Sequence, residues 1–103
     1  MILYREATNS VYINTKEQHK VSVALKNKGK VIKSLSAKNK FGSQVLLSLI
    51  KKIVDTSDIK GIEVETGPGS FTGLRVGVSV ANALGFALNI PVNGKKIETE
   101  LNY

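Results

Sequence analysis

The spacing of the apolar residues changes along this chain, and that change limits the fold more than any other feature. Residues 11–14, 21–25 and 31–37 alternate between apolar and polar side chains, which is the period of strands with one buried face. In residues 41–54 the apolar side chains recur at intervals of three and four, as in an amphipathic helix. Gly29 lies between the second and third runs and can adopt the positive φ of a tight turn. We therefore expect an antiparallel meander of three strands, followed by a helix.

The second half of the chain continues with strand and helix in alternation. Residues 59–66 have the pattern of a strand, residues 72–89 that of a long helix, and residues 91–92 open a last short strand. A helix that joins two strands of one sheet makes those strands parallel, with a right-handed connection. The order βββ-α-β-α-β predicts an α/β domain with a mixed five-stranded sheet and two main helices, which cover one or both faces of the sheet.

Length and composition narrow the class of protein. The chain has 103 residues, enough for one hydrophobic core, and no cysteine, which excludes disulfides and thiolate metal sites. Its most apolar stretch, residues 76–88, is shorter than the ~20 residues that cross a bilayer. The first residues have none of the features of a signal peptide. We expect a soluble, cytoplasmic domain that does not bind membranes.

The charge of the chain is strongly positive, with a formal net charge of +7. Eight lysines and a single acidic residue, Glu17, lie between positions 16 and 40. Such a surface attracts RNA or an acidic partner, or is simply solvated. We favour the solvated surface, because clusters that lack arginine and aromatic residues are weak signals of nucleic-acid binding.

The segment from Gly67 to Arg75 is a glycine-rich turn between a strand and a helix. Its glycines permit unusual φ values, and the free N–H groups of the helix start form a natural anion site. The spacing matches neither a Walker loop nor the dinucleotide fingerprint. Phosphate binding and a purely structural turn are therefore equal alternatives. The candidate phosphate or turn residues are Gly67, Gly69, Ser70, Thr72 and Gly73.

Arg75 lies in the first turn of the second helix, where the helix dipole disfavours a cation. It pairs either with Glu63 or Glu65 of the preceding strand, or with a carboxylate or phosphate of a partner. We favour the pair within the chain.

The helix of residues 72–89 has almost no polar face. A helix that is apolar all round must be covered on both sides, and a sheet covers only one. A row of small residues at every fourth position, Gly73, Gly77, Ala81 and Gly85, lets another backbone approach, either the sheet or a partner. We infer a protein partner on this helix and on the exposed edge of the first helix. The candidate contact residues are Leu46, Leu49, Ile53, Arg75, Val76, Gly77, Val80, Ala83 and Leu84.

The run from Gly67 to Val78, Gly-Pro-Gly-Ser-Phe-Thr-Gly-Leu-Arg-Val-Gly-Val, resembles the signature of the TsaB (YeaZ) family. Residues 58–62, 81–85 and 90–92 are similar to that family as well. The resemblance implies an actin-like (ASKHA), ribonuclease H-like lobe of the glycoprotease-like superfamily. It also implies a non-catalytic scaffold in the threonylcarbamoyladenosine modification of tRNA. Such a scaffold docks on a TsaD-like catalytic subunit, forms a homodimer through the same two helices, or does both, and its association with tRNA is indirect.

The sequence argues against the peptidase activity that the label glycoprotease implies. A metal site needs several ligands at set spacing, and His19 is the one histidine. The strand-one aspartate that such folds use near metal and phosphate is matched by Asn14. We expect no catalytic activity, no metal and no cofactor.

The resemblance also has departures that bear on function. On this basis we expect residues 1–103 to form a single N-terminal lobe, in which residues 1–10 are an extension. We also expect the second lobe of the family to be absent. Glu63 and Glu65 stand where relatives tend to be apolar, which predicts that one face of the sheet is more open. The alternative function is that of a nucleotide- or phosphate-binding actin-like protein that uses the glycine-rich turn, and a third is that of a remnant without a role.

Overall fold

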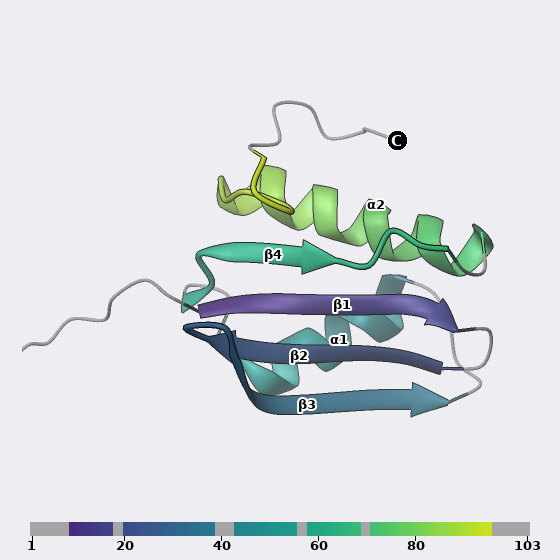
Figure 1. Ribbon diagram of the computed structural model, residues 1–103, viewed down its shortest axis with the longest axis horizontal. Coiled ribbons are helices and arrows are strands. Elements are labelled where there is room, and N and C mark those ends of the chain that lie inside the picture. The colour runs from purple at the N-terminus through teal and green to yellow at the C-terminus, as the bar shows by residue number, and fades with distance from the viewer. Residues whose placement is uncertain (1–8, 18–19, 39–42, 56–57, 69–70, 96–103) are drawn as a thin grey trace, which may run out of the picture.

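The computed structural model describes residues 9–17, 20–38, 43–55, 58–68 and 71–95 (Figure 1). Three strands are followed by a helix, a strand and a second, longer helix. Their bounds are β1 (Asn9–Glu17), β2 (Lys20–Asn27), β3 (Lys30–Lys38), α1 (Ser43–Ile53), β4 (Gly61–Val64) and α2 (Phe71–Leu88). The predicted order of the elements is confirmed as far as α2.

The strands form one mixed sheet in the order β3-β2-β1-β4. β1 and β2, and β2 and β3, pair antiparallel, while β4 runs parallel to β1 after the crossover through α1. The β2–β3 hairpin turns at Lys28 and Gly29, which have φ angles of 54° and 82°. Positive φ at both central residues matches the twist of a two-residue hairpin. The predicted meander is therefore confirmed.

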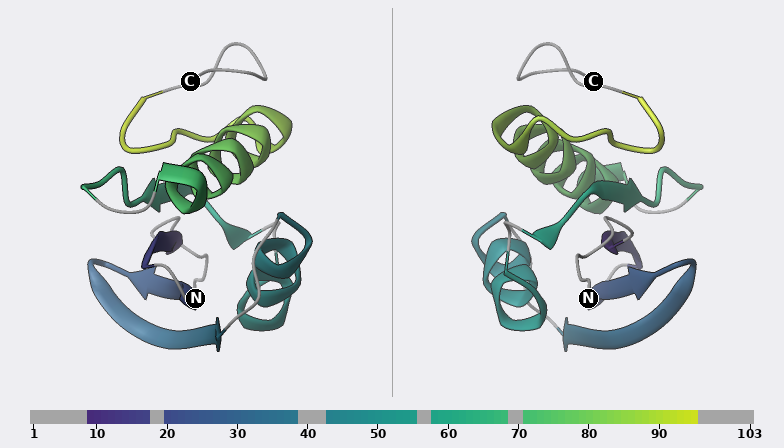
Figure 2. Two further views of the ribbon diagram at one scale, coloured as in Figure 1. Left: turned by 90° about the vertical axis from the view of Figure 1, so that its right-hand side faces the viewer. Right: turned by 90° about the vertical axis from the view of Figure 1, so that its left-hand side faces the viewer.

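Both helices cover the same face of the sheet (Figure 2). Alternate residues of the strands point to that face, and the registers Val11↔Leu25, Ile13↔Val23, Val11↔Ile62 and Ile13↔Val64 place them side by side. They are buried against α1 and α2, which also contact each other. We call this the covered face, and the opposite one the open face. The largest fully buried side chains are those of Ile13, Leu46, Ile50, Ile62, Val11, Val21, Val23 and Thr15.

The predicted fifth strand is wrong, because the sheet formed by the described residues has four strands. Val92 forms only an isolated parallel bridge with Ile62. The next two residues, Asn93 and Gly94, have φ angles of 50° and 82°, so the chain reverses there. Val92 and Lys95 then exchange both backbone hydrogen bonds, at 2.8 and 3.0 Å. This two-residue turn ends the parallel ladder after one rung.

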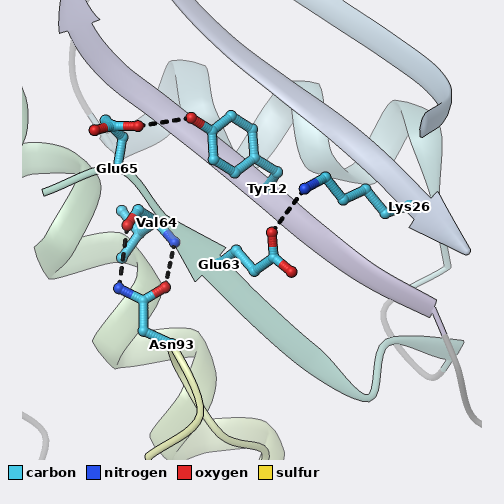
Figure 3. A network of polar contacts seen from close by, with 6 residues as sticks. All are labelled: Tyr12, Lys26, Glu63, Val64, Glu65 and Asn93. Carbon is cyan, nitrogen blue, oxygen red and sulfur yellow. Dashed lines mark hydrogen bonds and ion pairs between the residues drawn. The ribbon is translucent and has the colours of Figure 1, made fainter. Parts of the chain in front are cut away.

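The side chain of Asn93 replaces the rung that a fifth strand would have supplied. The N–H of Ile62 donates to the carbonyl of Pro91 at 3.0 Å, and the carbonyl of Ile62 accepts from the N–H of Asn93 at 2.8 Å. One residue pair further, the Asn93 amide accepts from the N–H of Val64 at 2.8 Å and donates to its carbonyl at 3.1 Å (Figure 3). The outward backbone groups of Ile62 and Val64 are therefore all hydrogen-bonded, which matters at a sheet edge.

Candidate functional site

The glycine-rich turn leads from β4 into α2, at the carboxyl end of the parallel strand. Gly67 has a φ of 121°, a conformation that favours glycine. Thr72 is exposed in the first turn of α2, and Gly73 is buried beneath it. Gly69 and Ser70 lie outside the described residues. Phosphate binding at this turn therefore stays a prediction.

A threonine of β1 holds the start of α2 against the sheet. Thr15 is fully buried, and its hydroxyl donates to the carbonyl of Gly73 at 2.6 Å. One helical turn further, a Cβ atom at Gly77 would overlap the hydroxyl oxygen of Thr15. Gly77 therefore permits the close approach of α2 to β1. Thr15 was not among the predicted site residues. The signal for it is present in the sequence, because the alternation of the buried Val11 and Ile13 in β1 continues to Thr15 and places it in the core.

The row of small residues in α2 faces the sheet of this chain. Gly73, Gly77, Ala81 and Gly85 are all buried, and Ala81 is fully so. Small side chains on the inner face of a helix shorten its distance to the strands below. Of the two alternatives for this row, contact with the sheet is thus the one that the structure shows.

The opposite side of α2 is the candidate partner surface, and we call it the outer face of α2. It carries Arg75, Val76, Ala83, Phe86 and Ala87, of which Val76 is half-buried and the others are exposed. Phe86 is 46% exposed, among the most exposed large apolar side chains in the described part of the chain. The same side of the helix also carries the polar Thr72, which is exposed, and Ser79, which is half-buried, so the face is mixed and Phe86 is its large exposed apolar group.

The predicted contact residues divide into two groups. Arg75 and Ala83 are exposed on the outer face of α2, Val76 is half-buried on that face, and Leu84 is half-buried and packs against the core. The other five are buried, namely Leu46, Leu49, Ile53, Gly77 and Val80. Sequence reasoning left Phe86 out of the contact set, although its exposed aromatic ring is the largest apolar group on that face. The sequence signal for Phe86 is its position three residues after Ala83, because residues three apart lie on the same face of a helix.

The predicted ion pair between Arg75 and Glu63 or Glu65 is wrong. The two carboxylates belong to the open face of the sheet, whereas α2 packs on the covered face. Glu63 instead accepts from the ammonium of Lys26 at 2.8 Å, and Glu65 accepts from the hydroxyl of Tyr12 at 2.8 Å (Figure 3). Arg75 therefore remains an exposed cation beside the apolar outer face.

Four side chains form a polar network on the open face, which we call the Tyr12 network. Besides the two contacts of Glu63 and Glu65, the Lys26 ammonium lies 5.0 Å from the centre of the Tyr12 ring. Burial raises the pKa of the Tyr12 phenol above its ordinary value of 10.0, and the hydrogen bond to Glu65 and the charges of both carboxylates raise it further. Each carboxylate of the network thus has a partner within the network. The position of Glu63 and Glu65 agrees with the prediction that they lie on a more open face.

Other predicted ligands do not converge on a site. Asn14 uses its side-chain oxygen to accept from the backbone N–H of Lys16 at 3.0 Å. His19 lies outside the described residues. Within the described ranges, three or more histidine, cysteine, aspartate or glutamate side chains nowhere gather as metal ligands. Neither helix of the described chain is long and apolar enough to cross a membrane.

Comparison with known proteins finds relatives that belong to the same group of proteins. Residues 39–94 match the family model described as TsaD, tRNA N6-adenosine threonylcarbamoyltransferase. The tRNA threonylcarbamoyladenosine biosynthesis protein TsaB of Escherichia coli is 35% identical over 78 residues, which cover 71% of this chain and 34% of that protein. The protein of the same name from Buchnera aphidicola is 36% identical over 88 residues, which cover 80% of this chain and 41% of that protein.

A solved structure extends the similarity to the fold. YeaZ from Pseudomonas aeruginosa superposes with a TM-score of 0.71 at 30% identity, over 82% of this chain and 42% of that one. The chain thus spans less than half the length of the relatives that it matches. The matched region includes α1, β4, the glycine-rich turn and α2, which together carry the candidate site.

Proposed function

We propose a function from one premise, which is that this chain belongs to the TsaD family and, within it, to the TsaB (YeaZ) proteins. The proposed function is that of a non-catalytic scaffold in the threonylcarbamoyladenosine modification of tRNA. In this role the lobe docks on a TsaD-like catalytic subunit through α2, or pairs with a second copy through the same helix. We infer that the lobe is actin-like, as the order of its elements and its similarity to YeaZ suggest.

The observation that carries the proposal is the outer face of α2. A partner helix placed on Val76, Ala83, Phe86 and Ala87 would bury apolar area that the lobe leaves exposed, and each Å² contributes roughly 25 cal/mol. Ala83 and Ala87 are small, so a second helix can approach closely between them. Arg75 at one end of the face offers a cation to an acidic group of the partner.

We propose a non-catalytic role because polar side chains on both faces of the sheet are engaged in contacts that hold the fold together. The hydroxyl of Thr15 donates to the carbonyl of Gly73, and the carboxylates of Glu63 and Glu65 accept from Lys26 and Tyr12. A nucleophile needs an adjacent base, and no such pair occurs among these contacts. The catalytic groups of the modification would then be supplied by the TsaD-like partner.

The test is the mass of the chain in solution, measured by light scattering alone and after mixing with the TsaD protein of the same genome. We expect a complex with TsaD, a homodimer, or both, and we expect Phe86→Glu to abolish them. Val31→Glu is the matched control, because Val31 is 57% exposed and lies on β3, at the far edge of the sheet. A wild-type chain that stays monomeric and does not bind TsaD would overturn the proposal.

A further inference from the structure

The two edges of the sheet differ, and the difference concerns β3. At the β4 edge, Pro91 and Asn93 engage the outward backbone groups. β3 forms the other edge and is nine residues long. A long edge strand presents a row of unpaired N–H and C=O groups to solvent. Two apolar side chains next to the hairpin turn, Val31 and Ile32, are 57% and 56% exposed.

A groove runs between β3 and α1, on the covered side of the sheet. Its volume is about 300 Å³. The floor is apolar and consists of Ala37, Val45 and Leu49, and the polar rim consists of Gln44, Ser48 and Lys52, all from α1. A strand added to β3 would direct every second side chain to this side of the sheet. The groove is therefore placed to accept alternate side chains of such a strand.

The charges beside the groove select the chemistry of that strand. Lys30, Lys33 and Lys38 are exposed on β3, Lys52 is exposed on the groove rim, and residues 28–38 contain no acidic side chain. Pairing β3 with the β3 of a second copy would bring lysines together across the new strand pair, which is destabilising. A strand that carries carboxylates would instead meet opposite charges at each of these positions.

We propose that β3 and the groove bind an extended acidic segment of another protein, which adds to the sheet as a strand next to β3. Backbone hydrogen bonds to β3 would supply affinity, and apolar side chains in the groove together with carboxylates beside the lysines would supply selectivity. This surface lies at the opposite edge of the sheet from α2. The proposal therefore stands or falls independently of the docking through the outer face of α2.

The test follows, by fluorescence anisotropy, the binding to the whole chain of a fluorescent nine-residue peptide whose odd positions are valine and glutamate in turn and whose even positions are threonine. One face of this strand offers both apolar side chains to the groove and a carboxylate to Lys52. We expect saturable binding that Lys52→Glu weakens about fivefold, the size of one surface ion pair lost and replaced by repulsion. Lys51→Glu is the matched control, because Lys51 is exposed in the same last turn of α1 but does not line the groove. We expect that variant and Phe86→Glu to bind as the wild type does.

Three outcomes would overturn the proposal. The first is the absence of saturable binding. The second is equal weakening by Lys51→Glu and Lys52→Glu, or a short single-stranded RNA of equal charge that displaces the peptide, since either would assign the effect to polyanion attraction. The third is undiminished binding of both of two peptides, one with proline at position 5 and one with proline at position 6, because one of these two adjacent N–H groups must face β3 in an added strand.

Discussion

Ile13 and Tyr12 are neighbours on β1, yet they belong to different environments. Ile13 points to the covered face, where it is fully buried among apolar side chains of the strands and both helices. Tyr12 points to the open face, where it is half-buried and contacts Glu65 and Lys26. The comparison shows that the covered face specifies the fold through close packing, whereas the open face needs only satisfied polar groups.

The largest expected effect is that of truncating the covered face. We expect Ile13→Ala to lower the free energy of unfolding by about 3 kcal/mol, because the deleted groups leave a cavity in the core. We expect Tyr12→Ala to lower it by only about 1 kcal/mol, the typical effect of a substitution that creates no cavity. Urea denaturation followed by circular dichroism measures both values. Equal losses for the two variants would contradict the contrast between the faces.

A smaller effect is expected from the contact between α2 and β1. Gly77→Ala should cost about 2 kcal/mol, because the added Cβ overlaps the Thr15 hydroxyl and must displace the helix or the strand. Combining it with Thr15→Ala should cost less than the sum of the two single changes, since the second change removes the overlapping group. Gly61→Ala is the control, because its Cβ would meet only the Pro91 carbonyl oxygen, 4.0 Å away. Strict additivity of the pair would argue against the contact.

The smallest effect concerns the pH dependence of the open face. The pKa of Tyr12 is raised in the folded chain by burial and by the carboxylates, so folding favours the protonated phenol. This contribution is complete below the unfolded pKa of 10.0 and is lost as the pH rises through the raised value. Between about pH 9 and about pH 11, unfolding free energy should therefore fall more steeply for the wild type than for Tyr12→Phe. The two proteins differ only at Tyr12, so the difference between the two slopes is the quantity to measure. Parallel slopes would contradict the Tyr12 network.

Local periodicity was sufficient to predict most of the fold. Alternation identified the strands and the three- and four-residue spacing identified both helices, because each pattern depends only on which side of an element is buried. The turn at Asn93 and Gly94 was missed, although Asn-Gly is a strong hairpin signal. Its consequence, a single bridge in place of a fifth strand, follows from the positive φ of both residues.

The candidate site was harder to predict, because it depends on which way each helix face points. α2 is apolar nearly all round, so its sequence cannot distinguish the row around Gly77, which faces the sheet, from the face around Phe86, which faces outward. The predicted ion pair of Arg75 was wrong for a similar reason. The alternation of β4 shows that Glu63 and Glu65 share a face, but the choice of the face that the helices cover is made by the tertiary packing.

The hydrogen bonds of Asn93 also bear on how this protein can polymerise. A sheet grows into a fibre only if each added chain brings a further strand edge with unpaired backbone groups, to which the next chain can bind. Here the amide of Asn93 occupies the outward backbone groups of Val64, and the backbone of Pro91 and Asn93 occupies those of Ile62, at one edge of the described sheet. A sheet with one occupied edge can accept a strand at β3 and then has no second site of growth. Association through this sheet should therefore stop after one added strand, and we expect concentrated solutions of the chain to form no fibrils.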